Sequence, residues 1–344
     1  MDYVEVDGSR GEGGGQMLRS AVAFSAIKRT PVRVVKIRAG REVPGLRRQH
    51  LSVLRVLAEV FGGELKRAAE GSQEVEFVPG APRLDATSAD MGTAASITLV
   101  LQAVVPAVGL SGSHLRLKLV GGTDVPWSPT FDYFSKVAKA GYEALGLGFE
   151  VEASRRGYYP RGGGSVTASI VPSGGVIPLD LVSRPPVETA RVTSQCGALP
   201  RAVAQRQADS AAEVLRGAGI DVQSEVSVGD ADSPGTSLLV SHLGSKAFLG
   251  SDAIGARGKR AEEVGRDAAA RFLATRRSGA CMDLNLADML LPLLSLARGE
   301  SRVMVPAMTP HLESSLGLAE LFTGCNWKSE PSGEGLLVTV TPGT

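Results

Sequence analysis

Cysteine and histidine are both scarce in this chain of 344 residues, and their scarcity limits the chemistry to be considered. The three cysteines are far apart and odd in number, so neither a metal-ligand spacing nor a disulfide framework is indicated, and we expect reduced cytosolic thiols. Only four histidines can take part in any histidine chemistry: His50, His114, His242 and His311.

Excess charge and long apolar runs are also missing. The formal net charge is only +1, which excludes a generally polycationic coat for nucleic acid and leaves any polyanion to a local patch. The most apolar run, residues 97–110, is too short and too interrupted to span a bilayer. The N-terminal MDYVEVDGSR is acidic and poor in apolar residues, unlike a signal peptide. We therefore expect a cytoplasmic protein with no membrane association.

One pattern of elements occurs three times, in residues 49–80, 131–173 and 311–343: a helix, a glycine turn, a strand, a polar turn and a second strand. LAEVFGG in the first copy matches LAELFTG in the third almost letter for letter. The pattern predicts a triplicated α/β domain, although the same order of elements is common in unrelated α/β proteins.

The residues between the second and third copies do not follow this order of elements. SRPPVE is typical of a linker, because two prolines prevent helix continuation. Strand-like and helical segments then alternate over about a hundred residues, enough for a small α/β domain. We predict an inserted domain at 183–278, between the second and third repeats, and a large catalytic domain made of 1–182 and 279–344.

A glycine-rich turn, DGSRGEGGGQMLR at residues 7–19, connects a short strand to an amphipathic helix. Its glycines allow backbone N–H groups to converge on a ligand, and the helix N-terminus adds positive potential. The spacing matches neither the Walker A pattern nor the dinucleotide fingerprint. Glu12 in the turn suits a divalent cation that bridges phosphates, and the alternative is a tight turn with a solvated glutamate.

An excess of basic residues follows between residues 33 and 48, opposed by Glu42 alone. A guanidinium group can bind two oxygens of one phosphate at once, and its position in a loop suits substrate binding. The alternative is a run of charges that only contacts solvent. The basic residues are Arg33, Lys36, Arg38, Arg41, Arg47 and Arg48. Together with the glycine-rich turn, this cluster predicts an enzyme that acts on phosphorylated substrates.

Seven motifs extend the argument to the whole chain, in this order: GSRGEGGGQMLRSAVAFS, IRAGREVPGLRRQHLSVLRVL, ITLVLQAVVPA, GGTDVPWSPT, GYYPRGGGSV, DLNLADMLLPLLSLA and PHLESSLGLAELF. In order and spacing they closely resemble the RNA 3′-terminal phosphate cyclases. The resemblance includes GARGKRAEEVG in the inserted segment.

The resemblance implies an α/β (α+β) fold: a large domain of three repeated βαβαββ-type units with a small inserted α/β domain. It implies a ligase that forms a phosphoric ester, with ATP and Mg²⁺ or Mn²⁺ as cofactors. An RNA with a 3′-terminal phosphate is the implied substrate, and its end becomes a 2′,3′-cyclic phosphate through a covalent histidinyl-AMP and an RNA-adenylate. The sequence leaves the oligomeric state open, a homodimer being one option.

By position, the family's nucleophilic histidine corresponds to His311. The residue also follows Pro310 at the opening of a predicted helix, where it can meet a ligand at the helix N-terminus. His50 lies beside the predicted substrate loop but is the weaker candidate, and His114 and His242 fall in or beside strand-like stretches.

The resemblance implies two further sets of residues, and Glu12 is also the implied metal ligand. The ATP-binding set is Glu12, Arg19, Gln102, Pro129, Asn285, Leu286, Ala287, Asp288 and Met289. The set for the RNA phosphates is Arg19, Arg38, Arg41 and Gln49. Asp288 is costly to bury unless it is paired. Asn285 replaces an aromatic or histidine common in the family, and Met289 replaces a glutamine, so the base preference is in doubt.

Two other readings stay open at this point. A catalytically inactive relative that acts in ribosome assembly would lack the nucleophile, whereas His311, Glu12 and Gln102 are present. Enolpyruvyl transferases share the repeated architecture but need no histidine nucleophile. The sequence shows no aromatic platform for bases, so we expect recognition of the terminal phosphate rather than of base sequence.

Overall fold

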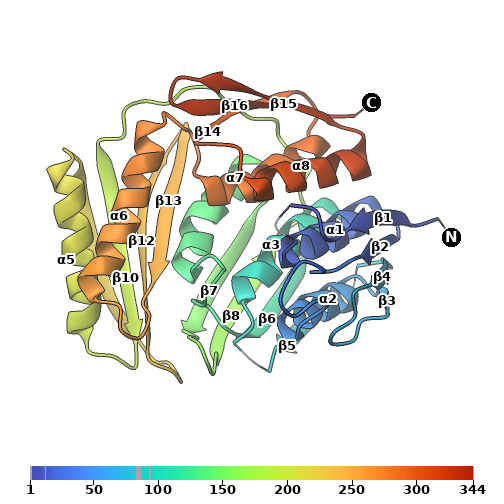
Figure 1. Ribbon diagram of the computed structural model, residues 1–344, viewed down its shortest axis with the longest axis horizontal. Coiled ribbons are helices and arrows are strands. Elements are labelled where there is room, and N and C mark those ends of the chain that lie inside the picture. Colours follow the sequence, from blue (N-terminus) through green and yellow to red (C-terminus); the bar gives the residue numbers. More distant parts are fainter. Residues whose placement is uncertain (1, 12, 83–86, 93, 344) are drawn as a thin grey trace.

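The computed structural model describes residues 2–11, 13–82, 87–92 and 94–343. Over these residues the strands form four sheets of four strands each. Three of the sheets surround a central group of helices, and the fourth lies at one side with two helices of its own (Figure 1). This mixed architecture confirms the predicted fold class.

The first unit has a βαβαββ order. Its first two strands are parallel, and its last strand lies between the second and the third in antiparallel pairing, giving the sheet order β1-β2-β4-β3. The elements are β1 (Val4–Asp7), α1 (Gly15–Lys28), β2 (Val32–Val35), α2 (Arg48–Val60), β3 (Glu64–Lys66) and β4 (Val75–Val78).

The second unit repeats this topology, with the sheet order β5-β6-β8-β7. Its second helix is divided into a π-helical segment, η1, and a short α-helix. The elements are β5 (Thr87–Asp90), α3 (Ile97–Leu110), β6 (Leu115–Gly121), η1 (Tyr133–Ala138), α4 (Lys139–Ala144), β7 (Phe149–Arg155) and β8 (Gly164–Ile170).

The third unit has the same order, β9-β14-β16-β15. Its elements are β9 (Asp180–Leu181), α7 (Leu284–Leu290), the 3₁₀ segment η2 (Leu291–Leu296), β14 (Ser301–Val305), α8 (Pro310–Thr323), β15 (Asn326–Ser332) and β16 (Gly335–Thr341). Since β9 pairs in parallel with β14, the unit begins before the inserted segment. The prediction that the insertion separates the second and third repeats was therefore wrong, because a two-residue strand leaves no periodic signal.

The inserted segment forms the fourth sheet, with the order β11-β10-β12-β13. Its elements are β10 (Thr189–Gly197), α5 (Arg201–Gly217), β11 (Asp221–Gly229), β12 (Gly235–Gly244), β13 (Ala247–Ile254) and α6 (Ala261–Arg277). The sheet and both helices share a separate hydrophobic core that includes Val192, Leu215 and Phe272. We propose that 183–278 is the small domain and that 1–182 and 279–344 form the large one.

Helices α1 and α3 occupy the centre of the three-unit body (Figure 1). Helix α3 is the apolar run of the sequence, and almost all of its side chains are buried. Helix α1 is buried continuously from Ala21 to Ala26, because α2, α3 and α8 all contact it, so it is less amphipathic than predicted. No helix of the described chain combines the length and apolar character that crossing a bilayer requires.

Asp283 joins the inserted domain to the large one. The side chain is 3% exposed, and it accepts hydrogen bonds from three donors. Tyr133 Oη donates to Oδ1 at 2.7 Å, the Leu286 N–H donates to Oδ1 at 3.1 Å, and the Gly250 N–H donates to Oδ2 at 2.8 Å. Burial raises the pKa of Asp283 to about 6. One side chain thus caps α7 and ties it to η1 and to β13.

We expect Asp283→Ala to lower the free energy of unfolding by about 3 kcal/mol, because three buried donors lose their acceptor and α7 loses its cap. Urea unfolding measures the change. The control is Asp180→Ala, which removes an exposed ion pair with Arg302 and should cost no more than about 1 kcal/mol. Equal losses in the two variants would contradict this role of Asp283.

Candidate active site

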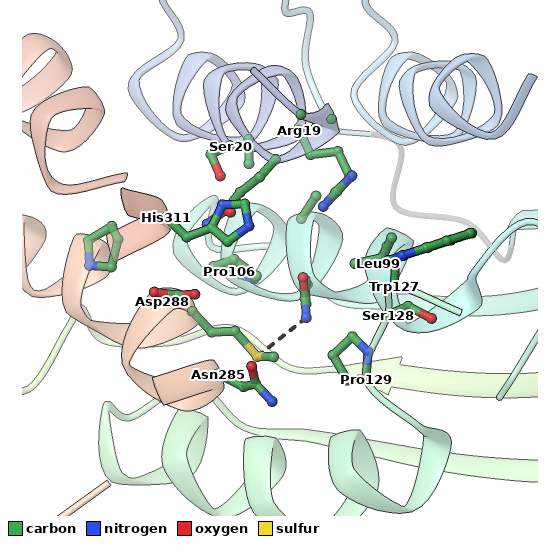
Figure 2. A pocket seen from close by; sticks show the side chains of 18 of the residues that line it. Arg19, Ser20, Leu99, Pro106, Trp127, Ser128, Pro129, Asn285, Asp288 and His311 are labelled. Atoms are coloured by element: carbon green, nitrogen blue, oxygen red, sulfur yellow. Dashed lines mark hydrogen bonds between the residues drawn. The ribbon is translucent and has the colours of Figure 1, made fainter. Parts of the chain in front are cut away.

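A cavity of about 840 Å³ lies where the three units and the inserted domain meet. Its walls come from one side of α1, the first turn of α2, α3, the loop at residues 127–129, α7, η2 and the start of α8 (Figure 2). The sequence-predicted residues that line it are Arg19, Arg38, Arg41, Gln49, Gln102, Pro129, Asn285, Asp288, Met289 and His311. Leu286 and Ala287 are instead buried in the hydrophobic core, and Glu12 lies outside the described residues.

His311 enters this cavity from the first turn of α8 (Figure 2). Thr309 caps the helix, since its Oγ1 accepts the Leu312 N–H at 2.9 Å, and Pro310 stands at the first helical position. The same hydroxyl donates to Asp288 Oδ1 on α7 at 3.2 Å. The sequence analysis required a partner for Asp288 if its carboxylate was buried. The side chain is only partly exposed, and this hydrogen bond supplies a partner. The start of α8 is thereby held to α7 beside His311.

The glycine-rich turn brings the other end of the chain to the same place. A β-carbon at Gly11, whose φ is +62°, would lie 2.5 Å from Ser314 Oγ on α8. Gln16 Nε2 donates to Ser315 Oγ at 2.8 Å, a contact between residues 299 positions apart. Only a residue without a side chain allows so close an approach of the turn to α8.

The start of α1 has the properties of an anion site. Its N-cap, Gly14, provides no side-chain hydrogen bond to the first turn, so the leading N–H groups are left for a ligand. A β-carbon at Gly15 would lie 2.5 Å from His50 Nε2 and 2.9 Å from Arg19 Nη1. The glycine therefore lets a neutral donor and a cation approach the helix terminus together.

Five members of the predicted basic cluster divide into two groups, and the sixth, Arg47, is exposed at the N-cap of α2. Arg33, Lys36 and Arg48 pair with carboxylates that the sequence places elsewhere: Glu74 and Glu5, Asp7, and Glu70 respectively. The expected local excess of positive charge is smaller for this reason. Arg38 and Arg41 line the cavity.

Arg38 is oriented by the backbone of its own loop. Its Nη1 donates to the carbonyl oxygens of Val43 and Gly45, both at 3.0 Å. Burial and, to a lesser extent, the nearby Arg47 and Arg41 lower the pKa of Arg38. A bound phosphate would offset the repulsion between these arginines, so the cluster favours an anionic ligand.

Arg19 faces the cavity from α1, and burial lowers its pKa to about 10. Over the described ranges no carboxylate forms an ion pair with it. A guanidinium desolvated in this way favours an anionic ligand.

His50, the weaker candidate for the nucleophile in the sequence, also lines the cavity. It is 4% exposed, and its Nδ1 accepts the Arg47 N–H at 3.1 Å, which assigns the proton of the neutral ring to Nε2. Burial, followed by Arg19, Arg38 and Arg47, lowers the pKa of His50 to about 4. The ring is therefore a neutral N–H donor at the start of α1. The only feature of the sequence that could have indicated this role is the position of His50 at a helix start, after three polar residues.

The opposite wall contains the two positions where the sequence departs from the family pattern. Met289 Sδ accepts a hydrogen bond from Gln102 Nε2 at 3.4 Å, the dashed line in Figure 2. Tyr142 Oη donates to the Gln102 carbonyl oxygen at 3.4 Å. Thioether sulfur is a weak acceptor, so the Gln102 amide keeps capacity for a ligand. Asn285 is exposed at the start of α7.

Asp252 and Trp127 are among the lining residues that were not predicted. Asp252 comes from β13 of the inserted domain, and its Oδ2 accepts the Thr130 N–H at 2.6 Å. Burial raises the pKa of Asp252. Trp127 belongs to the GGTDVPWSPT motif, but nothing in the sequence indicates that its ring is exposed.

Because the folded protein keeps His50 neutral, acidification favours the unfolded chain, whose histidine takes up a proton first. Relative to His50→Gln, the wild type should lose about 2 kcal/mol of unfolding free energy between about pH 7.5 and about pH 5. Urea unfolding at several pH values measures the difference. The matched control is His114→Gln, at an exposed position, which should leave the pH dependence unchanged. A pH-independent difference for His50→Gln would contradict the buried neutral state.

Comparison with known proteins agrees with this geometry. A family model described as RNA 3′-terminal phosphate cyclase matches residues 10–329. A protein of that name from Thermococcus kodakarensis is 42% identical over 94% of this chain and 94% of its own length. One from Ignicoccus hospitalis is 40% identical over 93% of this chain and 92% of its own.

Among solved structures, an EPSP synthase from Acinetobacter baumannii gives a TM-score of 0.29 at 10% identity, covering 94% of this chain and 62% of the synthase. Similarity at that level carries no argument about function. The family model and the relatives span nearly the whole chain, so the chain belongs to the RNA 3′-terminal phosphate cyclase family.

Proposed function

We propose that the protein converts the 3′-terminal phosphate of an RNA into a 2′,3′-cyclic phosphate at the expense of ATP, through a covalent histidinyl-AMP. The observation that supports this most directly is the position of His311. It faces a cavity whose other walls carry an uncapped helix start and three arginines, Arg19, Arg38 and Arg41. A nucleophile beside two sets of phosphate ligands suits the transfer of a phosphoryl-linked group.

The residues present fit ATP. The open N–H groups at the start of α1 suit its phosphates, and the missing side chain of Gly15 lets His50 and Arg19 approach the same helix start. We assign Gln102, Pro129 and Asn285 to the base and sugar, because all three line the same cavity. When bound, ATP supplies AMP as the activating group and pyrophosphate as the first leaving group.

We assign the divalent cation, Mg²⁺ or Mn²⁺, to Glu12. Within the described part of the chain no three histidine, cysteine, aspartate or glutamate side chains form a metal-binding group.

His311 begins the reaction as the nucleophile. One ring nitrogen bonds to the α-phosphorus while the bond to pyrophosphate breaks. An oxygen of the RNA 3′-phosphate next takes the AMP group and frees the histidine. The neighbouring 2′-oxygen then bonds to the 3′-phosphorus, loses its proton and displaces AMP.

Activation is needed because a phosphate monoester dianion repels nucleophiles and has no good leaving group. AMP supplies the leaving group, and the 2′-hydroxyl already lies close, so proximity favours ring closure. We place the 3′-phosphate between Arg38, Arg41 and Gln49, with the Nε2–H of neutral His50 as a further donor. Arg19 lines the same cavity as this group and His311, so we propose that it serves both phosphate sites.

We also infer a cytoplasmic location. The three cysteines, Cys196, Cys281 and Cys325, are all free and buried, as expected in a reducing compartment.

Incubation with α-labelled ATP and Mg²⁺ or Mn²⁺ should leave label on the protein, in an acid-labile and base-stable bond typical of a phosphoramidate. His311→Asn should abolish the labelling, because the amide is not a comparable nucleophile. His242→Asn, which lies on β12 outside the cavity, is the matched control and should label as the wild type does. Undiminished labelling of His311→Asn would overturn the assignment.

Arg38→Ala and Arg41→Ala should spare self-adenylylation but slow AMP transfer to a 3′-phosphorylated oligonucleotide by roughly 10- to 100-fold each, the loss of one or two charge-assisted hydrogen bonds. Single-turnover assays starting from the adenylylated enzyme measure this step. Arg48→Ala, whose side chain pairs with Glu70, is the control and should keep the wild-type rate. An equal loss in both steps would assign the two arginines to ATP.

A further inference from the structure

Trp127 is out of place by ordinary packing criteria. Only two tryptophans occur in the chain, and this one is 96% exposed. Indole rings usually contribute a large apolar area to a core or an interface. A fully exposed ring at the edge of the active-site cavity therefore indicates a partner that covers it in use.

The loop that carries Trp127 is firmly anchored on both sides. Before it, Val125 is 5% exposed, and its carbonyl oxygen accepts a hydrogen bond from Ser128 Oγ at 2.9 Å. After it, the Pro129 carbonyl oxygen accepts one from Thr98 Oγ1 at 2.8 Å, and the Thr130 N–H donates to Asp252 at 2.6 Å. The exposure of the ring is thus imposed by a fixed backbone.

The backbone of Trp127 has a φ of +60°, a region that bulky residues rarely occupy. Such a conformation persists only where its surroundings enforce it, and it is concentrated at functional sites. Here it belongs to the residue that presents an aromatic face at the rim of the cavity.

The position of the ring distinguishes between the two substrates. Trp127 and His311 lie on opposite sides of the cavity, and the indole points away from the side of His311 (Figure 2). ATP is small enough to be enclosed by the cavity. An RNA held by its terminal phosphate must leave the cavity, and its bases then pass over the rim.

We propose that Trp127 is a stacking platform for a nucleobase near the 3′ end of the RNA. The proposal rests on the proposed function, since it needs a single-stranded polynucleotide anchored at Arg38 and Arg41. Stacking on an aromatic ring tolerates any base, so the platform adds affinity without reading sequence. It supplies the base contact for which the sequence showed no candidate.

Trp127→Ala should raise the KM for a 3′-phosphorylated oligonucleotide by a factor on the order of 10, the usual effect of removing one stacked base. Trp127→Phe should recover most of the affinity. Self-adenylylation and kcat at saturating RNA should not change. Tyr159→Ala, which removes an aromatic side chain that is 69% exposed but does not line the cavity, is the matched control and should keep the wild-type KM.

The substrate offers the complementary change. An oligonucleotide with abasic residues at its last two positions should bind the wild type about as weakly as Trp127→Ala binds the intact one, with no further loss on combining the two. An equal effect of Trp127→Ala on intact and abasic substrates would overturn the stacking role. A raised KM for ATP in self-adenylylation would overturn it too, and would assign the ring to adenine.

Binding can also be followed without catalysis. In a Trp327→Phe background, Trp127 is the sole fluorophore of its kind, and a 3′-phosphorylated oligonucleotide without ATP should quench it, whereas the abasic one should not. Absence of quenching in a protein that labels and cyclises normally would sink the platform alone. If the wild type neither adenylylates itself nor cyclises the RNA end, the proposed function is refuted. The quenching measurement would still test the stacking platform in that case.

Discussion

The buried carboxylate of Asp283 is the contact on which the geometry of the site depends. It accepts hydrogen bonds from η1 of the second unit, from β13 of the inserted domain and from the first turn of α7, which it caps. Helix α7 in turn carries Asp288, which accepts a hydrogen bond from Thr309 at the start of α8. A continuous series of hydrogen bonds therefore connects the second unit and the inserted domain, through α7, to the start of α8, where His311 lies.

The parts of the fold that could be predicted are those with a periodic sequence pattern within a short stretch of the chain. The second helix and final hairpin of each unit have similar sequences and strong periodicity, so the three units were evident. Strand β9 has two residues, too few for any alternation, and its partner β14 is about 120 residues away. The point of insertion was therefore missed, because it is defined only by that pairing.

The same distinction applies to the candidate site. The glycine-rich turn and His311 carry local signals, a run of glycines and a helix start, and both line the same cavity. The charge of the basic cluster was overestimated because Glu74 and Glu70 lie far along the chain from the cations they pair with. The neutrality of His50 and the exposure of Trp127 depend on tertiary surroundings, which no window of sequence contains.

The approach of Gly11 to Ser314 has a consequence for biosynthesis. Helix α8 follows all the other helices of the described chain, so it leaves the ribosome last among them. The glycine-rich turn and the arginine loop are synthesised long before the helix that completes their pocket. A nascent chain thus acquires the glycine-rich turn and the loop of Arg38 and Arg41 early, but its cavity lacks the wall that carries His311 until α8 docks, and termination before residue 311 yields a product without that histidine.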